Sequence, residues 1–380
     1  MAQITLESIR KSFGKVKALD DVTLDVKDKE FFVLFGPAGA GKTTILKTIA
    51  GVEFPDAGLV KIGGEIVNLV DPALRNVSMV FENYALYPHL TVYDNIASPM
   101  RSPLYRRSEP EIKAEVHRVA EMMGIVPLLQ RLPGKLSNGQ RQRTALGRCL
   151  VRNPTVFLMD EPLAHLDAKL RHLMRTELKA MQQEFDTTTI YVTHDYAEAL
   201  SLGDRIAIIN EGRIIQVGSG DEVYYTPCDE FVARLVGEPE INIVDATLKS
   251  EGGRMMAVLT AGGKEYGYDL ADDVATILRA QAGDGKVRVG IRGINLDYRF
   301  EPGDGYMPGS VYNLEPIGNK SILTIKVDDQ MYQSVAPNNL SAKLDSAAYV
   351  KPDANNMLFF SAATGSFLCR HNQAHLIGRD

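Results

Sequence analysis

The stretch Gly36-Pro37-Ala38-Gly39-Ala40-Gly41-Lys42-Thr43-Thr44 follows directly on the apolar run Phe31-Phe32-Val33-Leu34-Phe35. A buried strand, a glycine-rich turn and then a helix form the arrangement of a phosphate-binding loop. Glycines allow backbone N–H groups to close around an anion, and a helix that begins near Lys42 directs its positive end at the same anion. The sequence therefore predicts a nucleotide-binding protein. In it Lys42 reaches the β- and γ-phosphates, and the Thr43 hydroxyl contacts a magnesium ion.

The composition is that of a globular protein with two or three domains. Of its 380 residues, 45% are hydrophobic and 24% are charged. The net charge of −6 does not favour nucleic acid as a partner. The three cysteines are far apart and lack metal-ligand spacing, which favours a reducing compartment. We see no secretion signal and no apolar stretch long enough to span a bilayer, so we expect other subunits to hold the protein at any membrane it serves.

Up to about Gly237, short apolar strands alternate with amphipathic helices, a pattern typical of a parallel sheet. Residues 155–159 and 189–193 are predicted to be fully buried strands, and residues 205–210 and 213–217 to form a hairpin around Glu211-Gly212. Between about 91 and 150 the strand signal disappears. A capping-box sequence at Ser108 there precedes apolar residues at helical spacing, so we expect a helical insert.

The character of the sequence changes after Gly237. Short alternating strands, such as 287–291 and 322–327, are separated by turns that contain Gly, Asp and Pro. This pattern predicts a small β-barrel domain of the oligonucleotide/oligosaccharide-binding (OB) type.

Two carboxylates and a histidine follow the predicted strands of the first domain. Asp160 and Glu161 come directly after residues 155–159, at the strand end that should lie beside the phosphate-binding loop. There Asp160 can hold the magnesium shell, and Glu161 can polarise an attacking water. His194 ends the strand 189–193 and is interpreted as a γ-phosphate contact; the alternative is a packed or surface histidine.

A second phosphate site is predicted at Leu136-Ser137-Asn138-Gly139-Gln140, where Ser137 is a good N-cap for a helix that runs to about Arg152. One nucleotide does not need two such helix ends from a single chain. The natural ligand of this second site is therefore an ATP molecule bound to another chain.

The order of these motifs along the chain resembles that of an ATP-binding cassette (ABC) ATPase. The motifs are the phosphate-binding loop, the Leu-Ser-x-Gly-Gln segment, the strand that ends in Asp-Glu, and the histidine. The likeness is to the ATPase subunits of bacterial carbohydrate importers of the maltose and glycerol-3-phosphate type, and it covers residues 1–240. Other matching segments are Val80–His89, Gly139–Arg143, Phe157–Leu163 and Tyr191–Asp195. Gly290-Ile291-Arg292 and Glu315–Gly318 more weakly resemble that family's C-terminal transport-associated domain.

The resemblance implies an α/β P-loop ABC nucleotide-binding domain over residues 1–236, with a helical subdomain at about 91–150. A C-terminal all-β, OB-like regulatory domain would follow over residues 237–380. ATP and Mg²⁺ are the implied ligands. The implied catalytic residues are Glu161, His194 and Lys42, and the implied metal ligands are Thr43, Glu82 and Asp160. The implied nucleotide contacts are Phe13, Gly36, Pro37, Ala38, Gly39, Ala40, Gly41, Lys42, Thr43, Thr44, Glu82, Ser137, Gly139, Gln140 and Asp167. Phe13 stands where the family stacks adenine, and the alternative is a packed Phe at a strand end.

The resemblance also implies an assembly. Two ATPase subunits, identical or related, would sandwich two ATP molecules head to tail at the cytoplasmic face of the membrane. They would bind two transmembrane permease subunits, and a solute-binding protein outside the membrane would take part indirectly. The helical insert and the segment Tyr84–His89 would seat a coupling helix of a permease. Nucleic acid is not an expected partner.

The sequence departs from the family pattern at several nucleotide contacts. Glu82 stands where the family has Gln, Asn138 replaces a Gly, and Ala164-His165-Leu166-Asp167 replaces Ser-Asn-Leu-Asp. Arg292-Gly293-Ile294 replaces Arg-Pro-Glu in the C-terminal domain. Three hypotheses follow: the energising ATPase of an importer for a sugar, polyol or sugar-phosphate-like solute; a slowly or non-hydrolysing regulatory subunit paired with a second ATPase; and a soluble cassette protein of translation or DNA repair. The single cassette and the acidic balance argue against the third.

Overall fold

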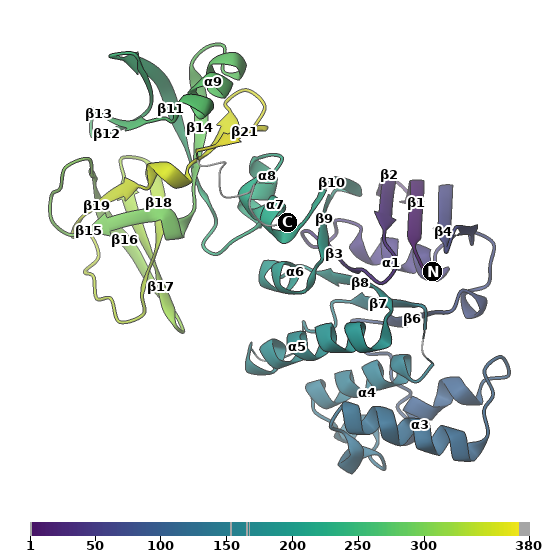
Figure 1. Ribbon diagram of the computed structural model, residues 1–380. Coiled ribbons are helices and arrows are strands. Elements are labelled where there is room, and N and C mark those ends of the chain that lie inside the picture. Colours follow the sequence, from purple (N-terminus) through teal and green to yellow (C-terminus); the bar gives the residue numbers. More distant parts are fainter. Residues whose placement is uncertain (1, 153, 165, 167, 372–380) are drawn as a thin grey trace. The chain divides into compact units, whose positions relative to one another are not determined.

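The computed structural model describes residues 2–152, 154–164, 166 and 168–371. The chain forms two compact units, Met1–Gly220 and Asp221–Asp380, which are described in turn (Figure 1). Within the described residues, no helix is long and apolar enough to cross a membrane.

A six-stranded sheet forms the centre of the first unit, in the order β10-β9-β3-β8-β7-β6. All neighbours are parallel except the β9/β10 hairpin, which confirms the predicted hairpin. Every residue of β3, β7 and β8 is buried, as predicted for the strands of a parallel sheet. The strands are β3 (Phe31–Phe35), β6 (Val77–Val80), β7 (Val156–Asp160), β8 (Thr188–Thr193), β9 (Arg205–Asn210) and β10 (Arg213–Gly218).

A second, antiparallel sheet in this unit was not predicted. Its order is β2-β1-β4-β5, and it consists of β1 (Ile4–Phe13), β2 (Val16–Val26), β4 (Ala57–Ile62) and β5 (Glu65–Ile66). The helix α1 (Lys42–Ala50) packs Ile45, Leu46 and Ile49 into one apolar core with residues of both sheets. Successive side chains of β3 point to opposite faces of the central sheet, as in any β-strand.

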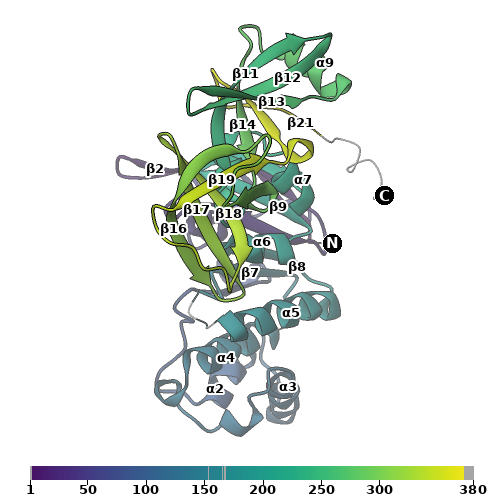
Figure 2. The ribbon, with the colours of Figure 1, turned by 90° about the vertical axis from the view of Figure 1, so that its left-hand side faces the viewer.

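The helices α5 (Ala168–Phe185) and α6 (Tyr196–Leu202) lie beside the central sheet, and Lys179 of α5 lies over the Phe31 ring of β3. Figures 1 and 2 both show α3 and α4 at one end of the unit, beyond α5, and Figure 2 shows α2 beside them. These are α2 (Val92–Ala97), α3 (Glu109–Met122) and α4 (Asn138–Leu150), joined by short 3-10 turns. They confirm the helical insert.

The capping box at the start of α3 is also confirmed. The Ser108 N–H donates to the Glu111 carboxylate at 2.9 Å, and Ile112, Val116 and Val119 are buried.

The second unit is built on two antiparallel sheets, which agrees with the predicted β-domain. Their orders are β13-β12-β11-β14-β20-β21 and β15-β19-β16-β17-β18, and one apolar core joins them. The strands are β11 (Asn242–Glu251), β12 (Arg254–Ala261), β13 (Lys264–Asp269), β14 (Lys286–Ile291), β15 (Leu296–Arg299), β16 (Met307–Ile317), β17 (Lys320–Val327), β18 (Gln330–Pro337), β19 (Ala347–Pro352), β20 (Leu358–Ser361) and β21 (Phe367–Arg370). The helix α9 (Asp272–Gln281) was not predicted, although Val274, Ala275 and Leu278 carry a helical apolar spacing.

Two short helices before the sheets, α7 (Gly220–Tyr225) and α8 (Glu230–Leu235), are fixed to this unit by one buried side chain. The Arg292 guanidinium donates to the carbonyl oxygens of Tyr224 at 2.8 Å and Ala233 at 2.9 Å, and also to that of Val236. Burial lowers the pKa of Arg292 to about 10. The compact units divide at the first residue of α7, whereas the sequence-based boundary at residue 236 follows α8 and stays a prediction.

Replacing Arg292 with Ala is expected to destabilise the second unit by about 3 kcal/mol or more, because buried carbonyl groups lose their donors. The measurement is urea or thermal unfolding of the full chain. The exposed pair of Arg254 with Asp269, 3.8 Å apart, provides the control. Arg254→Ala should change stability by less than about 1 kcal/mol. Equal effects of the two substitutions would contradict the role of Arg292.

Candidate active site at the phosphate-binding loop

The loop between β3 and α1 requires glycine at two positions that the structure makes explicit. Gly41 caps α1 with φ 107°, in the left-handed region, and a Cβ there would lie 2.6 Å from the Ala18 carbonyl oxygen. A Cβ on Gly36 would overlap the carbonyl oxygen of Ile209. The loop therefore fits closely between β2 and the β9/β10 hairpin, with its helix N-terminus open to an anion.

Lys42 is the first residue of α1, and only 5% of it is exposed. Its ammonium group donates to the carbonyl oxygens of Gly36 and Pro37, both at 2.9 Å, and lies 3.8 Å from the Glu161 carboxylate. Burial lowers the pKa of Lys42, while the charges of Glu161 and Asp160 oppose that shift. A cation is thus held inside the loop, where phosphate oxygens would bind.

Thr43 and Asp160 come together as predicted. The Thr43 hydroxyl donates to the Asp160 carboxylate at 3.0 Å. Burial raises the pKa of Asp160, the Thr43 hydrogen bond lowers it, and the negative charges of Glu161 and Glu82 raise it further. These hydroxyl and carboxylate oxygens are the hard donors that Mg²⁺ prefers. The described residues contain no cluster of three or more His, Cys, Asp or Glu that could enclose a metal.

Glu161 and His194 are neighbours because β7 and β8 are adjacent parallel strands that end at the same edge. The Glu161 carboxylate lies 2.9 Å from His194 Nδ1, and the Glu161 N–H donates to the Val192 carbonyl oxygen at 3.1 Å. Glu161 has φ 44°, a left-handed conformation that is uncommon for a residue with a side chain. The turn thereby directs a carboxylate toward Lys42 and the loop.

The end of β8, which directly precedes His194, is held by hydrogen bonds to Glu198. The Thr193 hydroxyl donates to the buried Glu198 carboxylate at 2.7 Å, and Tyr191 donates to the same group at 2.8 Å. Burial raises the pKa of Glu198. Asp195 caps α6 by accepting from the N–H groups of Ala197 and Glu198.

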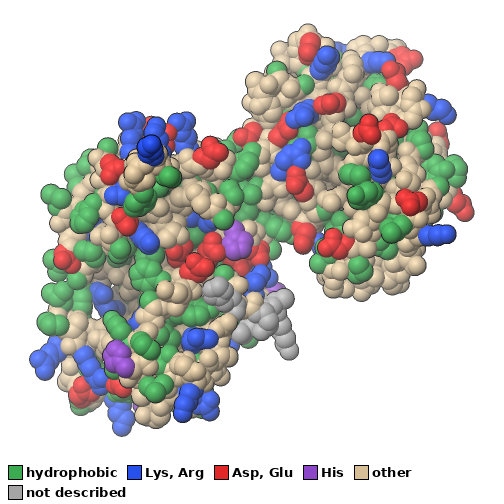
Figure 3. Space-filling model, turned by 180° about the vertical axis from the view of Figure 1, so that it is seen from behind, with side chains coloured by type: hydrophobic (Ala, Val, Ile, Leu, Met, Phe, Trp, Pro, Cys, Tyr) green, Lys and Arg blue, Asp and Glu red, His purple; other side chains and the backbone are tan. Residues whose placement is uncertain are grey.

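A cavity of about 750 Å³ unites these groups. Nine of the predicted residues line it: Ala38, Gly39, Gly41, Lys42, Thr43, Thr44, Glu82, Glu161 and His194. Four residues that were not predicted also line the cavity: Val16, Lys17, Ala18 and Glu211. The sequence does predict the hairpin that contains Glu211. It gives no indication that this hairpin packs on the phosphate-binding loop. Figure 3 shows acidic side chains gathered beside a histidine in the hollowed face of this unit.

Comparison with known proteins agrees with this geometry. A family model for the ABC transporter matches residues 19–164. The chain is 45% identical over 339 residues to the trehalose/maltose import ATP-binding protein of Thermococcus litoralis, covering 86% of this chain and 89% of that one. It is 39% identical over 368 residues to the sn-glycerol-3-phosphate import ATP-binding protein of Ruegeria pomeroyi, covering 96% and 99%. The chain belongs to the ABC transporter ATPase family.

A solved structure has the same ATP-binding cassette fold. A dimeric ATP-binding cassette in a post-hydrolysis state, bound to ADP and Pi, is 29% identical to this ABC ATPase with a TM-score of 0.53. The match covers 57% of this chain and 98% of that one. ATP hydrolysis is therefore the activity of the family in which this site occurs.

The Leu-Ser-x-Gly-Gln segment of this ABC ATPase forms the predicted helix start, but none of its residues is among the described residues that line the cavity. Ser137 and Gln140 form a capping box at the start of α4. The Ser137 N–H donates to the Gln140 side chain at 3.1 Å, and Ser137 accepts from the Gln140 N–H at 3.4 Å. Gly139 is buried, whereas Ser137 is exposed. Asn138 is not among the described residues with positive φ, so replacing the family's Gly there does not strain the turn. Its side chain accepts from Arg141 at 2.6 Å.

The other described residues predicted to contact the nucleotide do not line the cavity. Gly36, Pro37 and Ala40 belong to the loop backbone but are not lining residues of the cavity. Phe13 is 47% exposed at the end of β1, with the Lys11 ammonium 5.3 Å from its ring centre. Asp167 lies outside the described residues, as does His165.

Proposed function

We propose that this chain is the ATP-hydrolysing subunit that energises an importer for a sugar, polyol or sugar-phosphate-like solute. The arrangement of Glu161 between His194 and Lys42 carries the proposal, because it sets a general base beside a phosphate-binding cation. The names of the relatives support the solute class, since those proteins import maltose, trehalose and sn-glycerol-3-phosphate.

In this mechanism Lys42 and the N–H groups of the loop bind the β- and γ-phosphates of ATP. Thr43, Asp160 and Glu82 would hold Mg²⁺, which when bound neutralises phosphate charge. Glu161 accepts the proton of the attacking water, and His194 orients the Glu161 carboxylate through their hydrogen bond. Phe13, exposed beside the cavity edge formed by Val16, is proposed to stack on the adenine.

A second ATPase subunit completes the site in this proposal. Ser137, Gly139 and Gln140 cap a helix N-terminus and would bind the γ-phosphate held by the other subunit's loop. Asp167, which lies outside the described residues, is proposed as a further nucleotide contact. Closure on ATP and opening after hydrolysis would be a ligand-driven shift between two states.

Two transmembrane permease subunits would receive this motion at the cytoplasmic face of the membrane, and an external solute-binding protein would act through them. The segment 84–89 is a suitable contact. Arg148 of α4 donates to the carbonyl oxygens of Ala85 at 2.7 Å and Tyr84 at 3.0 Å, so the segment after Glu82 is tied to the helical insert. Tyr84 and Ala85 both have positive φ.

Glu82 distinguishes this proposal from a regulatory subunit that turns over ATP slowly or not at all. Replacing Glu82 with Gln removes one negative charge beside Asp160 and restores an N–H₂ donor. We expect the ATPase rate of the assembled complex to rise about fivefold, since a screened charge pair contributes up to about 1 kcal/mol. Half-maximal activity should then require more Mg²⁺. Unchanged rates and Mg²⁺ dependence would show that the departure is neutral.

Solute uptake tests the proposed function as a whole. A strain that lacks the chain is complemented with the wild type or with Glu161→Gln, and uptake of labelled sugars, polyols and sugar phosphates is measured. We expect one solute class to require the wild-type chain. Uptake that is equal with both versions, across the panel, would contradict the importer role.

A further inference from the structure

The side chains that line the nucleotide cavity come from the ends of neighbouring strands, so the order of the strands fixes the order of the side chains. The strands β9, β3, β8, β7 and β6 are parallel neighbours in that order, and their carboxyl ends lie along one edge of the sheet (Figure 1). The lining residues are Glu211 after β9, the phosphate-binding loop after β3, His194 after β8, Glu161 after β7 and Glu82 after β6. Glu211 therefore lies on the opposite side of the loop from the proposed hydrolytic groups.

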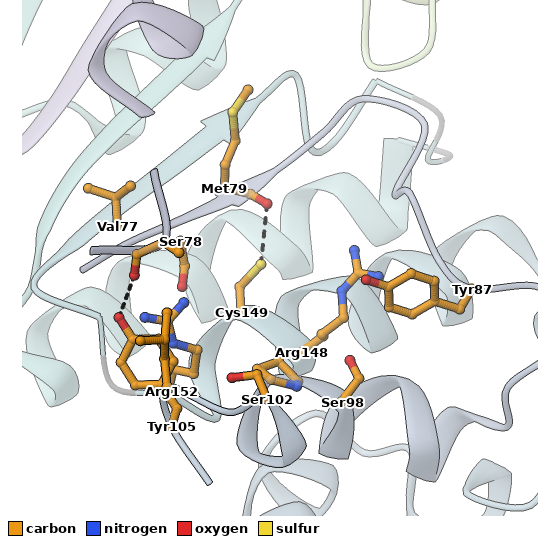
Figure 4. Close-up of a pocket in the computed structure, with 13 residues that line it drawn as sticks. Val77, Ser78, Met79, Tyr87, Ser98, Ser102, Tyr105, Arg148, Cys149 and Arg152 are labelled. Atoms are coloured by element: carbon orange, nitrogen blue, oxygen red, sulfur yellow. Dashed lines mark hydrogen bonds between the residues drawn. The ribbon is translucent and has the colours of Figure 1, made fainter. Parts of the chain in front are cut away.

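On the β6 side, the nucleotide cavity ends at Glu82. Beyond it, a separate cavity of about 400 Å³ lies between β6 and the helical insert, where Arg148 lies beside Tyr87 (Figure 4). No described residue lines both cavities. A nucleotide that follows the loop with its γ-phosphate at Glu161 must therefore extend its nucleoside the other way, toward β9 and β2.

The turn that carries Glu211 is fixed against both the loop and β2. The Gly212 N–H donates to the Ala40 carbonyl oxygen of the loop at 2.9 Å, and the Gly212 carbonyl oxygen accepts from the Asp20 N–H of β2 at 2.9 Å. The Arg213 guanidinium pairs with the Asp20 carboxylate at 2.6 Å. Glu211 itself has φ 45°, in the left-handed region. Its backbone is thus held one residue away from contacts with both walls of the cavity.

Glu211 brings to this end of the cavity a hydrogen-bond acceptor that the chain does not use. Its side chain is exposed, and no described residue donates a hydrogen bond to its carboxylate. A carboxylate has only acceptor atoms, so it repels phosphate oxygens and needs a donor from the ligand. The ribose hydroxyls are such donors, and a carboxylate that accepts from a ribose hydroxyl is a recurring device of nucleotide-binding α/β folds.

We propose that Glu211 accepts a hydrogen bond from a ribose hydroxyl of ATP, and that it makes the site discriminate against the nucleotide that lacks this hydroxyl. The inference rests on the proposed function, which supplies ATP as the substrate. It adds a residue that sets substrate specificity on the side of the loop away from hydrolysis. The sign of its effect is diagnostic. A negative charge alone would weaken the binding of a polyphosphate, whereas a ribose contact strengthens it.

Three nucleotides test this contact in the assembled complex: ATP, 2′-deoxy-ATP and 3′-deoxy-ATP. With the wild-type chain, we expect kcat/KM for one of the two deoxy analogues to be about tenfold lower than for ATP, the effect of one hydrogen bond to a charged group. Glu211→Ala should raise the KM for ATP about tenfold, leave kcat within about twofold and abolish the preference. Glu211→Gln keeps an amide oxygen that accepts a hydrogen bond, so it should retain part of the preference.

Asp21→Ala is the matched control. Asp21 is an exposed carboxylate on β2 that also has a left-handed backbone, φ 63°, but it is not a lining residue of the cavity. Its replacement should change the KM of all three nucleotides by less than about twofold.

Two results would overturn the inference and leave the proposed function standing. One is a wild-type complex that hydrolyses the three nucleotides equally well. The other is a Glu211→Ala variant whose KM changes by the same factor for all three, because a fall would then report charge repulsion and a rise would report a contact with the base. A wild-type complex that does not hydrolyse ATP would instead contradict the proposed function, and the inference with it.

Discussion

Replacing Glu161 with Gln is expected to lower the ATP turnover rate of the assembled complex by about 10³-fold, within the range that general-base catalysis contributes. The substitution keeps the size of the side chain and removes its ability to accept a proton. Lys42, Thr43 and Asp160 are untouched, so ATP should still bind with near wild-type affinity. Turnover is measured by phosphate release, and binding by equilibrium titration with Mg²⁺ and ATP.

The control for this change is Glu65→Gln, which neutralises an exposed carboxylate on β5, in the antiparallel sheet. It should leave both turnover and ATP affinity unchanged. Turnover that survives in Glu161→Gln would assign the base to another group. Loss of ATP binding in that variant would instead assign Glu161 a role in holding the nucleotide.

The second large effect is expected at Lys42. Replacing Lys42 with Met removes the cation that the loop carbonyls and Glu161 hold in place, and we expect ATP affinity to fall by about 10- to 100-fold. Hydrolysis should fall with it. The fold should not weaken, because burial lowers the pKa of Lys42, and keeping that ammonium charged at neutral pH therefore opposes folding.

Lys61→Met is the matched control. Lys61 pairs with Glu7 at 2.6 Å on the antiparallel sheet, where both side chains are partly exposed. That substitution should change ATP affinity less than about twofold and stability by less than about 1 kcal/mol. If Lys42→Met unfolds at a clearly lower temperature than the wild type, then Lys42 supports the loop itself, and the loss of affinity would not report a phosphate contact.

The core of the site could be predicted because it depends on local signals at the ends of parallel strands. Short, largely apolar runs with β-branched and aromatic residues identify β3, β7 and β8, and the polar residues that follow such strands must meet at one edge of the sheet. That rule is enough to group Lys42, Glu161 and His194 from the amino-acid sequence alone. The hydrogen bond between Glu161 and His194 and the contact of Thr43 with Asp160 agree with it.

Other features could not be predicted because they depend on contacts between distant segments. The antiparallel sheet that brings Val16, Lys17 and Ala18 to the cavity arises from pairing of β1 with both β2 and β4. The attachment of α7 and α8 to the second unit depends on Arg292, which lies far along the chain from both helices. No local pattern in either segment indicates its partner.

The central claim is that this ATPase powers a membrane transporter, and its most direct test is a purification from native membranes. The tagged chain is isolated in mild detergent, its partners are identified by mass spectrometry, and vanadate-sensitive ATPase activity is measured on the same sample. The account predicts two permease subunits, together with activity that Glu161→Gln abolishes. Soluble partners only, or a membrane complex whose ATPase activity is unaffected by Glu161→Gln, would contradict it.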